Sequence, residues 1–200
     1  MKHLIYFLCL ALLAWNCDHS GSGAKTADSL TTTDHTSISD VNAGSHSDTA
    51  SNFTAINETD REFLIKTAMG NTAEVEAGML AQQRGNSTAV KDFGAMMVKD
   101  HGEAQEKLKI IGGRLAISVL DSVDAAHKDL KDRLSALTGA KFDEEYIRAQ
   151  VKDHKETILL FEKEIAHGSN SELKQFATTT LPHIRMHLQK AENISGVTHK

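Results

Sequence analysis

Two copies of one polar hexapeptide place histidines in matching sequence contexts. Residues 98–103 read VKDHGE and residues 151–156 read VKDHKE, so five of six letters agree across an offset of 53 residues. Each copy carries an imidazole, His101 or His154, directly after a carboxylate, Asp100 or Asp153. Neutral imidazole is a common ligand of transition metals and titrates near neutral pH. The repeat therefore indicates a duplicated helical hairpin, or two histidines needed at one place, and these explanations are compatible.

Helical periodicity brings further polar side chains toward the same interior. At 100° per residue, His101 and His154 fall on or beside the apolar stripes of their segments. His187 lies at the edge of another apolar stripe, and Glu74 shares a side with small residues that allow close helix approach. All four positions are near the middle of their expected helices. We therefore predict that Glu74, His101, His154 and His187 converge at the waist of a bundle.

Three imidazoles and one carboxylate are suited to a single transition-metal ion, namely Zn, Fe, Mn or Cu. The same residues also fit an alternative, a metal-free network of buried histidines bonded to carboxylates and carbonyls that fixes helix register. In either case we expect neighbouring polar residues to orient the histidines through hydrogen bonds to their rings. The candidates for that role are Asp100, Asp143, Tyr146 and Asp153.

The elements that position these residues are helices, because Ala, Leu, Lys and Glu dominate the second half of the chain. Thr59 and Glu62 form a capping-box pattern at the expected start of the first helix. Glycines and Ser/Asn/Asp residues mark the other ends. The expected helices are 60–84, about 87–111 with a stop at Gly112-Gly113, a short one at about 122–137, about 141–167, and a last one capped at 169–171 and ending before Gly196. Pro182 removes one backbone hydrogen bond in the last helix.

The link between the second and third long helices is long enough to cross the bundle and make them parallel. This connectivity predicts an all-α, ferritin-like four-helix bundle with a short extra helix in the crossover. A di-iron site of the ferritin type needs Glu-x-x-His on two helices. The chain has no such motif, and its nearest variant is Asp124-x-x-His127 on the short helix.

Residues 58–195 resemble a bacterial ferritin-like family of exported proteins with a domain of unknown function, often labelled "predicted outer membrane protein". The motifs that carry this resemblance are Glu74-Val75, Phe93 with 97–101 (MVKDH), 139–146 (GAKFDEEY), 151–154 (VKDH), and Leu181-Pro182 with His187. The resemblance implies a ferritin-like bundle in the cell envelope and no established reaction.

The N-terminal part predicts export. Lys2 and His3 precede the apolar run 4–15, which is too short for a confident membrane span and is typical of a secretory signal. Cys17 stands where a lipoprotein signal places its lipidated cysteine, although Trp15 and Asn16 depart from the usual small residues. We expect residues 1–17 to be a signal of lipoprotein type, with a lipid on Cys17 as the membrane anchor. The alternative is an ordinary signal peptide in which Cys17 carries no lipid.

A tether rich in Ser, Thr and Asp is expected at 18–57, the bundle at 58–195 and a short tail at 196–200. Cys9 and Cys17 are the only cysteines, so the bundle has no disulfide or thiolate ligand. The net charge of −5 gives no basic field for nucleic acid.

The sequence contains no Gly-x-Ser-x-Gly, P-loop, HExxH or dinucleotide motif. We therefore do not expect an enzyme of those classes, and no catalytic residue is assigned. The alternative to metal binding is a non-catalytic interaction or stress-related module of the envelope, whose protein partner the sequence does not identify.

Overall fold

The computed structural model of the 200-residue chain describes residues 56–196. The predicted signal at 1–17 with its lipidation site Cys17, nearly all of the predicted tether, and residues 197–200 lie outside the described residues.

Five α-helices make up the described part of the chain. They are α1 (Glu58–Arg84), α2 (Thr88–Arg114), α3 (Ala125–Ser135), α4 (Gly139–His167) and α5 (Ser171–Ser195). Four long helices and one short crossover helix confirm the predicted all-α, four-helix-bundle fold.

The first helix starts earlier than its predicted cap. Asn57, and not Thr59, is the N-cap of α1, and its partner in the capping box is Asp60, and not Glu62. The Asn57 side chain accepts a hydrogen bond from the Asp60 amide at 2.8 Å, and the Asp60 carboxylate accepts one from the Asn57 amide at 2.7 Å. Asn57 also donates through Nδ2 to the carbonyl of His167 at 2.9 Å. Asn57, which was predicted to be the last residue of the tether, is thus attached to the bundle.

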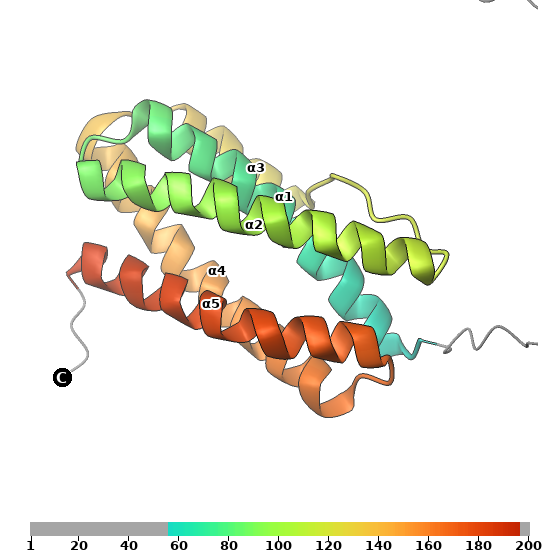
Figure 1. Cartoon of the computed structure of the whole chain (residues 1–200). Helices are drawn as coiled ribbons and strands as arrows, with labels where there is room; N and C mark the ends of the chain where they lie inside the picture. The colour runs from blue at the N-terminus through green and yellow to red at the C-terminus, as the bar shows by residue number, and fades with distance from the viewer. Residues whose placement is uncertain (1–55, 197–200) are drawn as a thin grey trace, which may run out of the picture. The chain divides into compact units, whose positions relative to one another are not determined.

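The helices are arranged as two hairpins, α1–α2 and α4–α5, that pack on each other (Figure 1). At one end, the turn after α1 meets the start of α4, because Gly85 and Gly139 form a parallel bridge. At the other end, the start of α1 contacts the start of α5 through Asp60 and Asn170, and the end of α2 contacts α5 through Arg114 and Glu172. Consequently α2 and α4 run parallel, as the predicted crossover requires.

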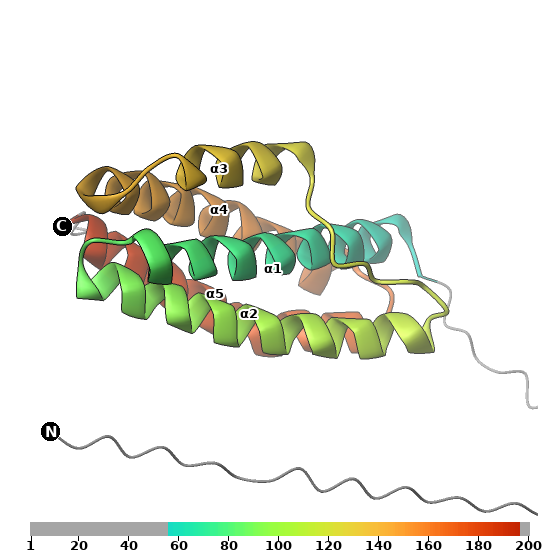
Figure 2. The same ribbon diagram turned by 90° about the horizontal axis from the view of Figure 1, so that it is seen from above.

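The crossover runs from the end of α2 back along the bundle, where α3 lies beside α4 and α1 (Figure 2). The predicted stop of α2 at Gly112-Gly113 is wrong, since the helix continues to Arg114. A Cβ on Gly112 would lie 2.5 Å from Val119 Cγ2 and 2.8 Å from the Ile117 carbonyl oxygen. Gly112 is therefore needed for the crossover to pack against α2.

The bundle interior has two apolar ends and a polar middle. One cluster contains Phe63, Phe161 and Phe176, and the other contains Phe93, Phe142 and Tyr146. Each long helix carries buried polar residues between the positions that these clusters occupy. They are Asn71 and Glu74 on α1, His101 and Gln105 on α2, Gln150 and His154 on α4, and His187 on α5. The predicted polar waist is therefore present.

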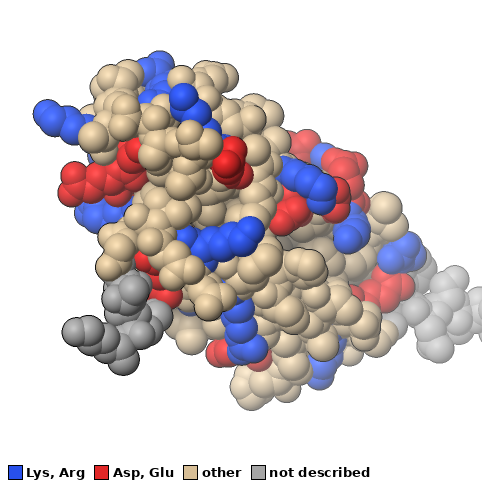
Figure 3. All heavy atoms as spheres, turned by 60° about the vertical axis from the view of Figure 1, so that its left-hand side comes forward, with Lys and Arg blue, Asp and Glu red and all other residues tan. Residues whose placement is uncertain are grey.

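The surface carries both basic and acidic side chains. On the face shown in Figure 3, Lys and Arg side chains are interspersed with Asp and Glu side chains, and neither sign covers a continuous area. Among residues 56–196, no helix combines the length and the apolar character that crossing a membrane requires.

Candidate metal centre

Three histidines from three helices meet at the bundle waist. His101 comes from α2, His154 from α4 and His187 from α5, and their exposed fractions are 5%, 2% and 1%. Their ring centroids are 5.7 Å apart for His101 and His154, 5.4 Å for His101 and His187, and 5.5 Å for His154 and His187. We call these residues the histidine triad. The level placement predicted from helical spacing thus holds for all three imidazoles.

Each triad ring uses one nitrogen to donate to an oxygen outside the triad. His101 Nδ1 bonds Asn71 Oδ1 at 3.0 Å, and His154 Nδ1 bonds the Gln150 carbonyl oxygen at 2.9 Å. His187 Nε2 bonds Asp100 Oδ2 at 3.0 Å. An acceptor at one ring nitrogen assigns the proton to that nitrogen, so the other nitrogen keeps its lone pair. Metal-binding histidines are oriented by bonds of this kind.

A chain of side-chain amides sets the tautomer of His101. Asp121, in the crossover, accepts a hydrogen bond from Gln105 Nε2 at 3.0 Å. Gln105 Oε1 then faces Asn71 Nδ2 at 3.3 Å, which leaves Asn71 Oδ1 for His101. A carboxylate only accepts hydrogen bonds, so the direction of the whole chain is fixed from Asp121 inward.

The inward nitrogens of the triad have no protein donor. Within the described residues, His101 Nε2, His154 Nε2 and His187 Nδ1 are buried and make no hydrogen bond. One ligand nitrogen of each histidine lies within 4.8 Å of those of the other two, so the triad could hold a metal ion. Buried acceptors are rarely left unpaired, because their desolvation costs about 1–3 kcal/mol each.

Burial keeps the triad neutral. Desolvation is the main cause that lowers the pKa of His101 well below its ordinary value, and the charges of the other two histidines add to it. Desolvation likewise lowers the pKa of His154 to about 3. For His187 desolvation also lowers the pKa, although the hydrogen bond to Asp100 opposes the shift. Neutral imidazole is the form that binds metals, so no proton has to leave at neutral pH.

Glu74, the fourth predicted ligand, lies outside the group of inward nitrogens. Its Oε2 accepts a hydrogen bond from Gln150 Nε2 at 2.7 Å, and its Oε1 is 3.8 Å from His154 Nδ1. The carboxyl is therefore on the outer side of the His154 ring, away from the free Nε2. Burial raises the pKa of Glu74 to about 8, which favours the protonated form at neutral pH. The geometry thus favours three ligands over the predicted four.

Of the residues predicted to orient the histidines, only some bond a triad ring. Asp100 orients a triad histidine, but that histidine is His187 and not its sequence neighbour His101. Asp153 pairs with Lys152 at 3.4 Å and bonds no triad ring, and burial raises its pKa. Tyr146 is fully buried and packs on Phe93 and Phe142, and burial raises the pKa of its hydroxyl.

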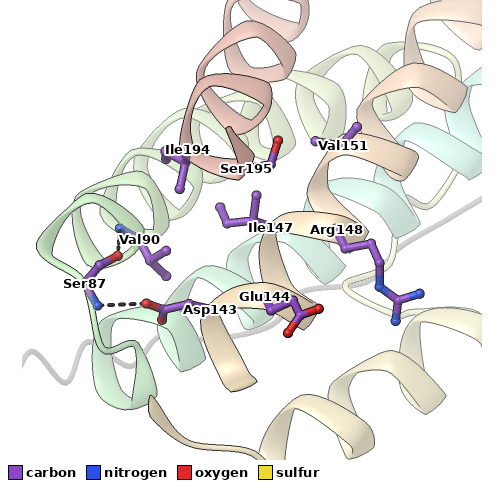
Figure 4. Close-up of a pocket in the computed structure, with 9 residues that line it drawn as sticks. All are labelled: Ser87, Val90, Asp143, Glu144, Ile147, Arg148, Val151, Ile194 and Ser195. Carbon is purple, nitrogen blue, oxygen red and sulfur yellow. Dashed lines mark hydrogen bonds between the residues drawn. The ribbon is translucent and has the colours of Figure 1, made fainter. Parts of the chain in front are cut away.

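Asp143 lies at the end of the bundle and holds the α1–α2 turn. Its carboxylate accepts hydrogen bonds from the amides of Asn86 and Ser87, both at 2.8 Å. Figure 4 shows the bond to Ser87. Asp143 lines a cavity of about 440 Å³ with apolar walls that include Val90 and Ile194. No triad residue lines this cavity, so Asp143 orients no metal ligand.

Sequence reasoning missed the amides that orient the triad. Gln105 follows His101 by four positions and Gln150 precedes His154 by four, so both lie on the inward faces. An amide one turn from a buried histidine was the signal available. The role of Asp121 had no such signal, because it depends on how the crossover folds back.

Residues 45–194 match the family model described as "Domain of unknown function (DUF4142)". The chain belongs to this family. The DUF4142 match begins within the predicted tether, before the first residue that the structure describes. No curated protein matches the DUF4142 chain.

Two solved structures are similar in fold to this DUF4142 protein. One is a DUF305 fragment from Deinococcus radiodurans, with 11% identity and a TM-score of 0.63 over 71% of this chain and 98% of that chain. The other is a conserved hypothetical protein from Mycobacterium tuberculosis, with 12% identity and a TM-score of 0.55 over 71% of this chain and 94% of that chain. At this identity the similarity establishes the helical-bundle fold alone.

Proposed function

We propose that this DUF4142 domain binds one transition-metal ion through His101 Nε2, His154 Nε2 and His187 Nδ1. The observation that carries the proposal is the set of three buried, inward lone pairs that have no donor among the described residues. The outward nitrogens are already bonded to oxygen acceptors, which is the usual arrangement behind metal-binding histidines.

The spacing needs only a small adjustment to fit an ion. Zn–N bonds of about 2.0–2.1 Å in tetrahedral geometry place ligand nitrogens about 3.3 Å apart. The triad nitrogens lie within 4.8 Å of one another, so closing the site requires pairs of them to approach by at most about 1.5 Å.

An all-nitrogen set suits Zn, Cu or Fe better than Mn, because Mn prefers oxygen ligands. Three protein ligands leave a fourth position open, as in catalytic zinc sites, although no reaction follows from that alone.

The competing arrangement is a metal-free polar network. It has to supply donors to three inward nitrogens, yet the three N–H groups of the neutral triad all point outward. Ordered water would have to fill that role. Metal binding explains the same geometry with one ion.

Metal analysis tests the proposal directly. The full chain, purified without a histidine tag, is loaded with Zn(II), Cu(II), Fe(II) or Mn(II), desalted and analysed for metal. We expect about one ion per chain, and less than about a tenth of an ion in His154→Ala, because ligand loss strongly weakens a three-ligand site. The matched control is His167→Ala, which removes an exposed histidine at the end of α4. Wild-type protein that retains no ion after loading would exclude the proposal.

Thermal unfolding gives a second readout. An ion that binds the native state alone stabilises it by about 2.7 kcal/mol at a free concentration of 100 Kd. For a domain of this size that corresponds to an increase in Tm of about 8 °C. The increase should disappear in His154→Ala and persist in His167→Ala.

We further propose that the domain works in the cell envelope, anchored by a lipid on Cys17. Three features of the sequence support this: Lys2 and His3, the apolar run 4–15 and the polar segment that follows. Mass spectrometry of the mature protein should show an acylated N-terminal Cys17. A mature N-terminus at any other residue would rule out the anchor.

A further inference from the structure

A hollow between α2 and α5 connects the histidine triad with the surface. It has a volume of about 140 Å³, and His101 and His187 both line it. Its rim is formed by Lys99, Glu103 and Lys107 of α2 and by Thr180 and His183 of α5. The cavity at the bundle end and the hollow between α3 and α4 have no triad residue in their walls. The space between α2 and α5 therefore offers an ion a route toward the triad.

The opposite side of the triad is closed. His154 lies against the ring of Phe93, with a centroid distance of 6.5 Å, and its Nδ1 is bonded to its own helix. Gln150 and Glu74 are bonded to each other behind it. An ion therefore meets His187 and His101 before His154.

The rim offers one imidazole that is free to bind. His183 is exposed and lies one turn before His187 on α5, and its side chain makes none of the hydrogen bonds or ion pairs seen among residues 56–196. The carboxylates at the rim are engaged, because Lys99 pairs with Asp100 at 3.3 Å and with Glu103 at 3.1 Å. Lys99 and Lys107 balance the charges of Asp100 and Glu103, so no net negative charge attracts a cation to the mouth. The imidazole of His183 is therefore the unengaged ligand that the mouth offers to the ion.

We propose that His183 is a capture ligand, which binds the incoming metal ion transiently at the mouth of the hollow and passes it to the histidine triad. The inference rests on the proposed function. In each step one imidazole nitrogen replaces one water molecule on the hydrated divalent ion. His187, His101 and then His154 bind the ion in this way, and one water molecule finally replaces His183 on the ion.

A capture ligand changes rates and leaves the final affinity unchanged. Co(II) is the probe, since its visible absorption reports the formation of a four-coordinate site. In stopped-flow mixing of Co(II) with the full chain, we expect His183→Ala to lower the association rate about tenfold, within the range over which variants of one site differ. The dissociation rate into excess chelator should fall by the same factor, so that Kd stays within about twofold of wild type. His167→Ala is the matched control and should leave both rates unchanged.

A second variant tests the route independently of His183. Ala104 also lines the hollow, so Ala104→Leu should narrow it and slow both rates without altering the final absorption spectrum.

The possible results separate the two proposals. Binding with unchanged rates in His183→Ala overturns the capture role and leaves the triad site intact. A weaker Kd at an unchanged association rate overturns it as well, because His183 would then be a permanent ligand. An equal slowing by His167→Ala would show general surface attraction and also overturn it. Absence of Co(II) binding to wild type overturns the capture role and, when Zn(II), Cu(II) and Fe(II) also fail to bind, the proposed function too.

Discussion

The carboxylate of Asp100 on α2 and the imidazole of His187 on α5 are joined by a 3.0 Å hydrogen bond between Oδ2 and Nε2. Asp100 is the sequence neighbour of His101, yet it orients the histidine of another helix. The corresponding Asp153 in the second hexapeptide bonds no triad ring. The two copies of VKDH have therefore diverged in role. Both present a histidine to the waist, but only the first supplies a carboxylate that orients the triad.

This difference gives a matched pair of variants. Asp100→Asn removes the charge behind His187, and loss of such an orienting group lowers metal affinity about 10–100-fold. Asp153→Asn makes the same chemical change at the equivalent position and should change affinity by less than about threefold, because no triad ring depends on it. Competition with a chelator of known Zn(II) affinity measures the Zn(II) affinity of both variants. Equal losses in the two variants would show that overall charge, and not the bond to His187, controls binding.

The close approach of α1 and α2 gives a prediction on stability. A Cβ on Gly78 would lie 2.6 Å from the carbonyl oxygen of Gly94, and a Cβ on Gly94 would lie 2.7 Å from Ala81 Cβ. Since backbone has to move to admit it, Gly78→Ala should lower the free energy of unfolding by about 1–3 kcal/mol.

Gly70 is the control for this change, because it lies in the same helix and nothing would be within 4 Å of its Cβ. Gly70→Ala should raise the free energy of unfolding by about 0.5–1 kcal/mol through helix propensity. Urea denaturation measures both variants, and effects of the same sign would contradict the packing argument.

Helix order, the parallel crossover and the level of the triad were predictable, because local patterns determine them. Apolar periodicity placed His101, His154 and His187 inward, and the hairpin glycines fixed the direction of each helix. Errors arose where a distant segment decides the outcome. Thr59 is a suitable cap by itself, but Asp60 has partners at the start of α5, and this makes Asn57 the cap. Glu74 is inward as predicted, yet its carboxyl is hydrogen-bonded to Gln150 of another helix and does not join the inward nitrogens of the triad.

Asp60 connects the starts of two helices and should be important for stability. Its Oδ1 accepts hydrogen bonds from the amides of Ser169 and Asn170, both at 3.0 Å, and its Oδ2 accepts one from Asn57. Asp60→Ala leaves these amides without their acceptor and should lower the free energy of unfolding by about 3 kcal/mol. The exposed Asp129 serves as the control, with an expected change within about 0.5 kcal/mol for Asp129→Ala. Similar losses in both variants would contradict the connecting role of Asp60.

Glu164 should make the metal-free protein less stable as pH rises. It is fully buried on α4. Desolvation, and then the neighbouring Asp60, raises the pKa of Glu164 from an ordinary value of 4.5 to about 7. The folded state therefore holds this proton between pH 4.5 and about 7, where the unfolded state has lost it. The resulting contribution to stability is complete below pH 4.5 and is lost as pH rises to about 7.

Glu164→Gln keeps the shape of the side chain and removes this titration. At pH 8 the variant should be more stable than wild type by about 3 kcal/mol, and the difference should shrink toward pH 4.5. Burial also raises the pKa of Glu74. Glu74 is present in both the wild type and the variant, so its contribution cancels from the difference in their free energies of unfolding. The exposed Glu162 is the control, and Glu162→Gln should show no such pH-dependent gain. Urea titrations in the presence of chelator measure the difference, and a constant offset across pH 4.5–8 would mean that Glu164 does not exchange its proton on unfolding.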